Sequence, residues 1–256
     1  MAVNAFVLTL FTDDPELARA ADDAGIERIG VDLEQLNKLA RQAGTNSRLS
    51  GHRIESLAPI RAVLRRAQLF ARSNPLHDGS AAEIEALLGH SVAVIMLPYF
   101  RTADELACFC RLVDGRAVVV GLAETVESLD CMGDILLTPG LGEIHFGLND
   151  LRLQMGLASH FDVLATPRFQ EAAALVRRSG VPFGVAALAR PYDRSLPVDP
   201  REVCRQIVSL GATRAFVARS FFGPDYDLAR LPADLALLRQ TIGSFVPDAP
   251  CVLAAV

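Results

Sequence analysis

The sequence predicts an α/β protein that folds as a single, closed (β/α)8 TIM barrel over residues 1–256. Short apolar runs rich in Val, Ile, Leu and Phe alternate with amphipathic segments along the whole chain. Eight such runs fit within the 256 residues, which is the count and size of a barrel of this type. No stretch rich in Pro, Gly or Ser separates one part of the chain from another, so one domain is expected.

Each apolar run predicts a buried parallel strand, because its residues are continuously apolar and do not alternate with polar ones. The predicted strands span residues 4–12, 28–34, 68–74, 92–100, 117–125, 143–151, 182–189 and 214–222. Helices are expected between them, and the clearest patterns cover residues 13–25, 80–90, 102–113, 168–180 and 199–211. Several of these open with Ser, Thr or Asp and close with Gly, as helix caps do. Residues 35–55 are expected to form a loop after the second strand.

A doubly wound open sheet is the main alternative fold. It would usually carry a glycine-rich phosphate loop after the first strand. The segment "LTLFTDDPEL" at that place contains no glycine, and the barrel is therefore favoured.

Composition excludes several classes of function. The net charge of −5 and the absence of a basic run disfavour a nucleic-acid partner. No apolar run approaches the roughly 20 residues needed to span a bilayer, and no secretory signal is recognisable. The five cysteines lack the spacing of a zinc site. A cytoplasmic protein that acts on a small molecule is expected.

The number and position of lysine residues limit the catalytic mechanisms to be considered. The only lysine is Lys38, in the polar stretch "LEQLNKLARQ". Schiff-base catalysis and pyridoxal phosphate need a desolvated lysine amine, so both are disfavoured.

Polar residues end several of the predicted strands. In a TIM barrel these ends form the active-site rim, so their side chains should gather there. They are Asp32 and Glu34, Arg72 and Asn74, Glu124, Asn149 and Asp150, and Arg219 and Ser220.

Glu124 and Asp150 could converge on a divalent cation, with Mg²⁺ or Mn²⁺ preferred because the ligands are oxygens. Arg72 would bind the carboxylate of an anionic substrate, since its planar guanidinium donates two parallel hydrogen bonds. The alternative for any one strand-end acid is that it caps the next helix or pairs with a neighbouring arginine.

Five segments carry a resemblance to a known family: "VDLE", "FARSNP", "VIMLPYFRTADEL", "GLAETVESL" and "IHFGLNDL". In order and spacing they resemble the HpcH/HpaI aldolase and citrate lyase beta-subunit family, within the phosphoenolpyruvate/pyruvate barrel superfamily. The resemblance covers residues 28–222. It implies metal ligation by Glu124 and Asp150, and substrate binding by Arg72. It also implies that Asp32 and Glu34 organise the catalytic site.

The resemblance has departures at the acidic pair. The aldolase branch usually places a histidine directly after it, and here that residue is Gln35. His52, in "RLSGHR", is the nearest candidate for the general base. His145 falls inside the sixth predicted strand and is expected in the core or behind the site.

Further substrate contacts are expected from Asn149, Arg219 and Ser220 at the strand ends. Arg190 is a secondary candidate. These arginines could hold a distal carboxylate of the substrate, or pair with Asp193 or Asp225.

The expected function is that of a metal-dependent, class II type aldolase or carbon–carbon lyase. Its substrate would be a 2-oxo acid such as pyruvate or oxaloacetate, or a related acyl-CoA ester, and a metal-stabilised enolate would form. The alternatives are a citrate-synthase-like condensing enzyme of secondary metabolism, or a catalytically impaired barrel that binds a metabolite.

Self-association is also expected. The apolar tail "SFVPDAPCVLAAV" suggests an interface, and the resemblance implies a trimer or hexamer. The tail could instead pack on its own barrel.

Overall fold

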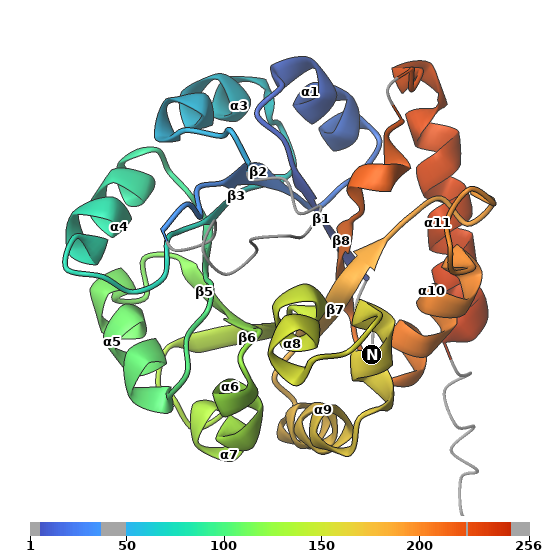
Figure 1. Ribbon diagram of the computed structural model, residues 1–256. Helices are drawn as coiled ribbons and strands as arrows, with labels where there is room; N and C mark the ends of the chain where they lie inside the picture. The colour runs from blue at the N-terminus through green and yellow to red at the C-terminus, as the bar shows by residue number, and fades with distance from the viewer. Residues whose placement is uncertain (1–5, 37–49, 224, 247–256) are drawn as a thin grey trace, which may run out of the picture.

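Eight parallel strands close into a barrel in the computed structural model, which describes residues 6–36, 50–223 and 225–246. Each strand pairs with the next along the chain, and the eighth pairs with the first. Figure 1 shows the ring viewed along its axis. The predicted TIM barrel is confirmed. The strands are β1 (Val7–Phe11), β2 (Arg28–Asp32), β3 (Gln68–Arg72), β4 (Val94–Leu97), β5 (Val118–Ala123), β6 (Leu141–Phe146), β7 (Phe183–Leu188) and β8 (Arg214–Val217).

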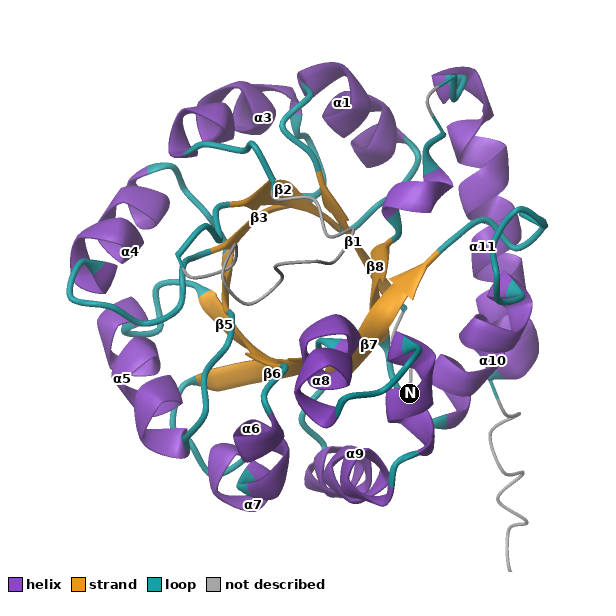
Figure 2. Cartoon of the chain, viewed as in Figure 1, coloured by secondary structure: helices purple, strands orange, loops and turns teal. Residues whose placement is uncertain are grey.

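Helices cover the outside of this ring (Figure 2). Five of the ten α-helices in the described residues begin at a capping side chain; Thr102, for example, accepts the backbone N–H of Glu105. None of the helices in the described part of the chain is long and apolar enough to cross a bilayer. They are α1 (Pro15–Asp23), α3 (Leu57–Val63), α4 (Ser80–Gly89), α5 (Ala103–Val113), α6 (Val126–Asp130), α7 (Met132–Ile135), α8 (Leu148–Met155), α9 (Pro167–Ser179), α10 (Pro200–Ser209) and α11 (Leu231–Phe245), with short 3-10 turns η1 (Ile54–Ser56), η2 (His160–Ala165), η3 (Arg219–Phe221) and η4 (Leu228–Arg230).

Two predicted strands are wrong in their second halves. The run 143–151 ends as a strand at Phe146, and Leu148 begins α8. The run 214–222 ends at Val217 and is followed by η3. Both strands stop where the chain reaches the barrel rim, and the polar residues beyond that point belong to the connections. The apolar residues continue past these strand ends, so the sequence pattern did not show where the strands stop.

Some predictions fall on residues that the structure does not describe. Lys38 and most of the predicted loop 35–55 lie in the gap at 37–49. Most of the apolar tail lies beyond residue 246. The predicted trimer or hexamer stays a prediction.

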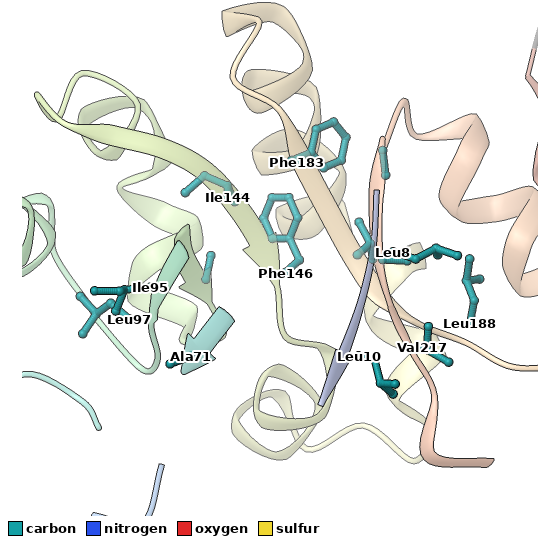
Figure 3. Close-up of a cluster of buried hydrophobic side chains, with 14 of the residues drawn as sticks. Leu8, Leu10, Ala71, Ile95, Leu97, Ile144, Phe146, Phe183, Leu188 and Val217 are labelled. Carbon is teal, nitrogen blue, oxygen red and sulfur yellow. The ribbon is translucent and has the colours of Figure 1, made fainter. Parts of the chain in front are cut away.

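Apolar side chains pack in two places. One cluster lies between the strands and the helices and includes Leu8, Ile95 and Phe146 (Figure 3). The other includes Phe70 and Met96. In β3, Phe70 belongs to the second cluster, while its neighbours Leu69 and Ala71 belong to the first. Because successive side chains of a strand point to opposite faces, the second cluster fills the inside of the barrel.

An ionic network lies at the N-terminal ends of the strands. Arg28, the first residue of β2, donates two hydrogen bonds of 2.7 and 2.8 Å to Glu143. Arg214, the first residue of β8, donates a third of 3.2 Å. Burial opposes the charge of Glu143, but the two arginines hold its pKa below the usual value. This end of the barrel is filled by side chains, and the functional site is expected at the other end.

Candidate active site

A cavity of about 490 Å³ opens beside the C-terminal ends of the strands. It is lined by residues from β3 and from β5 to β8, from α8, α10, η2 and η3, and from the connection between β7 and α10. The predicted site residues that line it are Arg72, Glu124, Asn149, Asp150, Arg219 and Ser220. The remaining three, Asp32, Glu34 and His52, are connected to Arg72 directly or through Asp32. All nine predicted residues therefore belong to one neighbourhood.

Arg72 is held by two acidic residues from the end of β2. Its Nε and Nη2 donate hydrogen bonds of 2.8 and 2.6 Å to the two carboxylate oxygens of Asp32. Its Nη1 lies 3.4 Å from Glu34 Oε2. Burial by itself lowers the pKa of Arg72, but the charges of Asp32, Glu34 and Glu124 raise it above the ordinary value. A fixed, fully charged guanidinium therefore lines the cavity.

The segment that carries Glu34 is clamped by Asn74. The side-chain oxygen of Asn74 accepts the backbone N–H groups of Gln35 and Leu36 at 2.9 and 3.0 Å. Its amide nitrogen donates to Glu83 Oε1 at 3.0 Å. Asn74 was predicted at the rim as a polar strand-end residue, and its contacts give it a positioning role.

Glu124 follows β5 directly and is buried. Its Oε1 accepts the backbone N–H of Tyr99 at 3.1 Å. Tyr99 has a left-handed backbone with φ of 53°, which is costly for a bulky residue. The strained exit from β4 thus points a backbone donor at this carboxylate.

Gly147 lets the start of α8 approach Glu124 closely. A Cβ atom at residue 147 would lie 2.6 Å from Glu124 Oε2 and 2.7 Å from Glu124 Cβ, so any side chain there would force Glu124 to shift. α8 begins at the next residue and carries Asn149 and buried Asp150 in its first turn. In Figure 1 this helix lies inside the ring of outer helices, beside β6 and β7.

The opening of α8 accounts for the acidic residue in "GLNDL". The first N–H groups of a helix have no partner within the helix, and they favour a nearby negative charge. Asp150 is therefore tolerated at a buried position and lines the same cavity as Glu124.

The donor chemistry of Glu124 and Asp150 fits Mg²⁺ or Mn²⁺. Within the described ranges, no three His, Cys, Asp or Glu side chains gather into a complete metal site. Mg²⁺, however, is usually held by only one or two carboxylates, with waters and substrate oxygens completing its shell. Two buried carboxylates that line one cavity with Arg72 meet that requirement.

His52 has both ring nitrogens directed at other groups. Its Nδ1 accepts the backbone N–H of Asp32 at 3.1 Å, so in the neutral ring the proton is on Nε2. That nitrogen lies 3.5 Å from Asp13 Oδ1. Burial lowers the pKa of His52, and Arg219 lowers it further, against the opposing charges of Asp13 and Asp32. These contacts describe a neutral residue that supports Asp32.

His145 lines the cavity from β6, as a buried residue. Its Nε2 lies 3.2 Å from the carbonyl oxygen of Ala186, and a carbonyl can only accept, so this nitrogen donates. Burial lowers the pKa of His145 to about 4. Ala186 has φ of 53°, and His145 helps to hold this unusual backbone in β7.

The arginines at the later strand ends differ from each other. Arg190 pairs with Asp193 at 3.2 Å, which was one of the two roles expected for it. Arg219 and Ser220 are exposed at the mouth of the cavity.

Sequence reasoning missed several contributors to the site. Tyr99 was missed because its role depends on a backbone angle. Gly147 stood within a quoted motif, and glycine before a polar pair could have signalled a close approach. The apolar side of the cavity was also missed: Leu196 and Val198 lie in a connection without a strand or helix pattern, and Phe161 lies in η2, whose start at Ser159 and Asp162 could have been recognised as a capping box.

No protein-family profile matches the chain. Solved structures with a similar fold include an HpcH/HpaI aldolase from Desulfitobacterium hafniense DCB-2, with a TM-score of 0.64 and 16% identity over 93% of each chain. An HpcH/HpaI aldolase/citrate lyase family protein from Burkholderia cenocepacia J2315 gives 0.66 and 16% over 94% of this chain and 95% of the other. The citrate synthase SbnG gives 0.61 and 17% over 94% of each. The chain thus shares, over nearly its whole length, the fold of the HpcH/HpaI aldolase and citrate lyase group that its sequence motifs resemble.

Proposed function

We propose that the protein is a divalent-metal-dependent carbon–carbon lyase or aldolase that acts on a 2-oxo acid such as pyruvate or oxaloacetate, or on a related acyl-CoA ester. One observation carries the proposal: Arg72, Glu124 and Asp150, from three separate elements, line a single cavity. The similarity of fold to HpcH/HpaI aldolases and a citrate synthase supports it.

Each charged group has a separate role in this proposal. Arg72 binds the substrate carboxylate or 2-oxo oxygen and stabilises the negative charge that develops as the carbon–carbon bond breaks or forms. Asp32 keeps the guanidinium in place with its two hydrogen bonds. A Mg²⁺ or Mn²⁺ ion held by Glu124 and Asp150 would supply Lewis-acid polarisation of the 2-oxo group.

The chain's own residues also limit access of water. Leu122, Leu148 and Phe216 line the cavity close to the charged residues, and a low-polarity wall strengthens the electrostatic effect of Arg72. Asn149, Ser220 and Arg219 would contact the substrate from the rim.

A metabolite-binding barrel without turnover is the second candidate. The residue after the acidic pair is Gln35, which is exposed and cannot transfer a proton. Condensation in the manner of a citrate synthase uses the same enolate chemistry, and its direction depends on the metabolites supplied.

Hydrogen exchange at the methyl group of pyruvate tests the proposal without a second substrate. We expect the protein to exchange these protons with D₂O in the presence of Mg²⁺, as followed by proton NMR, and to stop when EDTA is added. Glu124→Gln and Asp150→Asn should each lower the exchange rate at least 100-fold, since each removes a metal-binding charge. Glu127→Gln, an exposed acid on α6, should leave it unchanged. Absence of exchange at any metal concentration would leave the binding barrel as the better description.

A further inference from the structure

We propose that the cavity has an apolar compartment next to its charged end, and that the portion of the substrate beyond the 2-oxo acid is an uncharged, apolar chain. This inference rests on the proposed function and names its substrate class. In the cleavage direction the apolar chain would leave on the aldehyde product. In the condensation direction it would arrive with an aldehyde acceptor.

Four segments build the apolar side. Leu148 comes from the first turn of α8, and Phe161 comes from η2. Leu196 and Val198 come from the connection between β7 and α10, and Val203 comes from α10 itself. These side chains come from separate segments and line one cavity, so the fold brings the apolar wall together and no single sequence motif predicts it.

Charge is nearly absent from this wall. Of the cavity-lining residues that the described parts of α8, η2, the β7–α10 connection and α10 supply, Asp150 alone is acidic and none is Lys or Arg. His160 lines the cavity from η2, but burial lowers its pKa, and the nearby Arg152 lowers it further against the charge of Asp162. A second carboxylate on the substrate would lose its hydration here without gaining a partner.

The charged part of the cavity and the apolar wall lie next to each other. Leu148 lies two residues before Asp150 on α8, and both line the cavity, so the apolar wall begins beside the acidic group. A 2-oxo acid whose carboxylate is held by Arg72 would extend its third carbon and any further chain away from the charged end. The volume of about 490 Å³ falls in the range of pockets that hold drug-sized ligands, about 300–1,000 Å³. It is more than the six non-hydrogen atoms of pyruvate require.

The connection that carries Leu196 and Val198 is held in shape by local contacts. Asp193 accepts the backbone N–H and hydroxyl of Ser195 at 3.0 and 2.6 Å, and it pairs with Arg190. At its other end, Asp199 accepts the N–H of Arg201 and starts α10.

Asp234 of α11 fixes the same connection from outside. The hydroxyl of Tyr192 donates to Asp234 Oδ1 at 2.8 Å, and that of Tyr226 donates to Oδ2 at 2.9 Å. Arg190 lies over both tyrosine rings, 5.7 and 5.6 Å from their centroids. These contacts hold the connection in one shape, so the apolar wall that it carries is preorganised for a ligand.

Arg219 lies at the mouth and is exposed. It is near enough to His52, which contacts β2, to influence its ring. Arg219 belongs to η3, directly after β8, whereas the apolar side chains come from α8, η2, the β7–α10 connection and α10.

Binding of a series of 2-oxo acids tests the inference without any turnover. The probes are pyruvate, 2-oxobutanoate, 2-oxohexanoate and 2-oxooctanoate, titrated by calorimetry in the presence of Mg²⁺. We expect the affinity to rise by roughly fourfold for each added methylene that the wall covers. An affinity that is flat or falls with chain length, or no binding of any of the four acids, would overturn the inference.

A charged probe of equal length sharpens the test. 2-Oxoadipate carries a terminal carboxylate where 2-oxohexanoate ends in a methyl group, and we expect it to bind at least tenfold more weakly. Equal or tighter binding of 2-oxoadipate would contradict an apolar compartment and would point to Arg219 as the partner of a second carboxylate.

Two variants assign the effect to the wall. Leu196→Asp should abolish the gain in affinity from pyruvate to 2-oxooctanoate, and Val198→Thr, which keeps the side-chain shape, should reduce it. Leu137→Asp places the same charge at a leucine that is 80% exposed and absent from the cavity lining, and it should retain the full gain. A Leu196→Asp variant with an unchanged gain would refute the assignment.

The two proposals can fail separately. Chain-length-dependent binding without methyl exchange of pyruvate would reject the enzyme and keep the apolar compartment. Methyl exchange of pyruvate together with an affinity that does not depend on chain length would keep the enzyme and reject the apolar compartment.

Discussion

Asp32 and Arg72 are register partners on the adjacent strands β2 and β3, and their side chains form a two-point ion pair at the barrel mouth. The side chain of Asp32 is only 2% exposed and that of Arg72 is 14% exposed. The pairing of two strand ends thus fixes the one cation that we assign to the substrate carboxylate.

Replacing Asp32 by Asn should destabilise the protein. The change preserves the shape of the side chain but leaves the buried charge of Arg72 without its main partner, which costs about 3–5 kcal/mol in comparable cases. The free energy of unfolding in urea measures the loss. Asp78→Asn, at an exposed position, serves as the control. A loss below about 0.5 kcal/mol, the range of ordinary surface changes, would mean that the pair carries little energy.

Gly147→Ala should displace the side chain of Glu124 and leave the backbone conformation at residue 147 unchanged. Residue 147 has φ of −93°, which alanine adopts easily, so the effect comes from the contact with Glu124. We expect the carboxylate to be displaced and the affinity for Mn²⁺ to fall at least tenfold in calorimetric titrations. Gly133→Ala, where an added Cβ meets no atom within 4 Å, should retain the wild-type affinity. Unchanged Mn²⁺ binding in the Gly147 variant would argue against Glu124 as a ligand.

His52→Gln distinguishes a general base from a positioning residue. Because Nδ1 accepts from Asp32 and Nε2 faces Asp13, we expect methyl exchange of pyruvate to fall less than tenfold, with an unchanged pH profile. A loss above 100-fold, together with removal of the acidic limb of the profile, would restore His52 to the role of general base that the sequence suggested.

Because the pKa of His145 is lowered in the folded protein, the free energy of unfolding should decrease as the pH falls below about 6.5. Its pKa is about 4 in the folded protein and about 6.5 in the unfolded chain, so between these values the unfolded state binds the extra proton. Its contribution is fully present above pH 6.5 and is lost as the pH falls towards 4, to a total of about 3 kcal/mol.

Urea unfolding at pH 7.5, 6, 5 and 4.5 measures this effect. His52 and His160 also have lowered pKa values, so the quantity to compare is the difference between wild type and His145→Gln. We expect the variant to lose stability less steeply below pH 6.5. Parallel curves would show that His145 is protonated at the same pH in both states.

Tyr226→Phe should loosen the wall of the apolar compartment. It removes the hydrogen bond to Asp234 and should cost about 1 kcal/mol of stability, with a smaller gain in affinity from pyruvate to 2-oxooctanoate. Tyr99→Phe is a matched control, because it removes the hydrogen bond from Gln154 at a tyrosine absent from the cavity lining. If both variants lose the gain equally, the anchoring of the β7–α10 connection is not responsible.

Much of this protein is determined by its sequence alone. Eight continuously apolar runs separated by capped amphipathic segments leave few ways to bury every strand on both faces, and a closed barrel is the one observed. Six of the nine polar residues expected at one rim line a single cavity. Arg72, Glu124 and Asp150 line one cavity because the carboxyl ends of all parallel strands meet on the same side.

The tertiary structure alone decided how those residues are used. The ion pair of Arg72 with Asp32 depends on strand register, the approach of Glu124 to α8 depends on Gly147, and the hydrogen bond from Tyr99 depends on a left-handed backbone. The apolar wall gathers Leu148 from α8, Phe161 from η2 and Leu196 from the β7–α10 connection. Local patterns report periodicity and caps within a segment. Contacts between segments depend on closing the barrel, and no local pattern encodes the distances that closure sets.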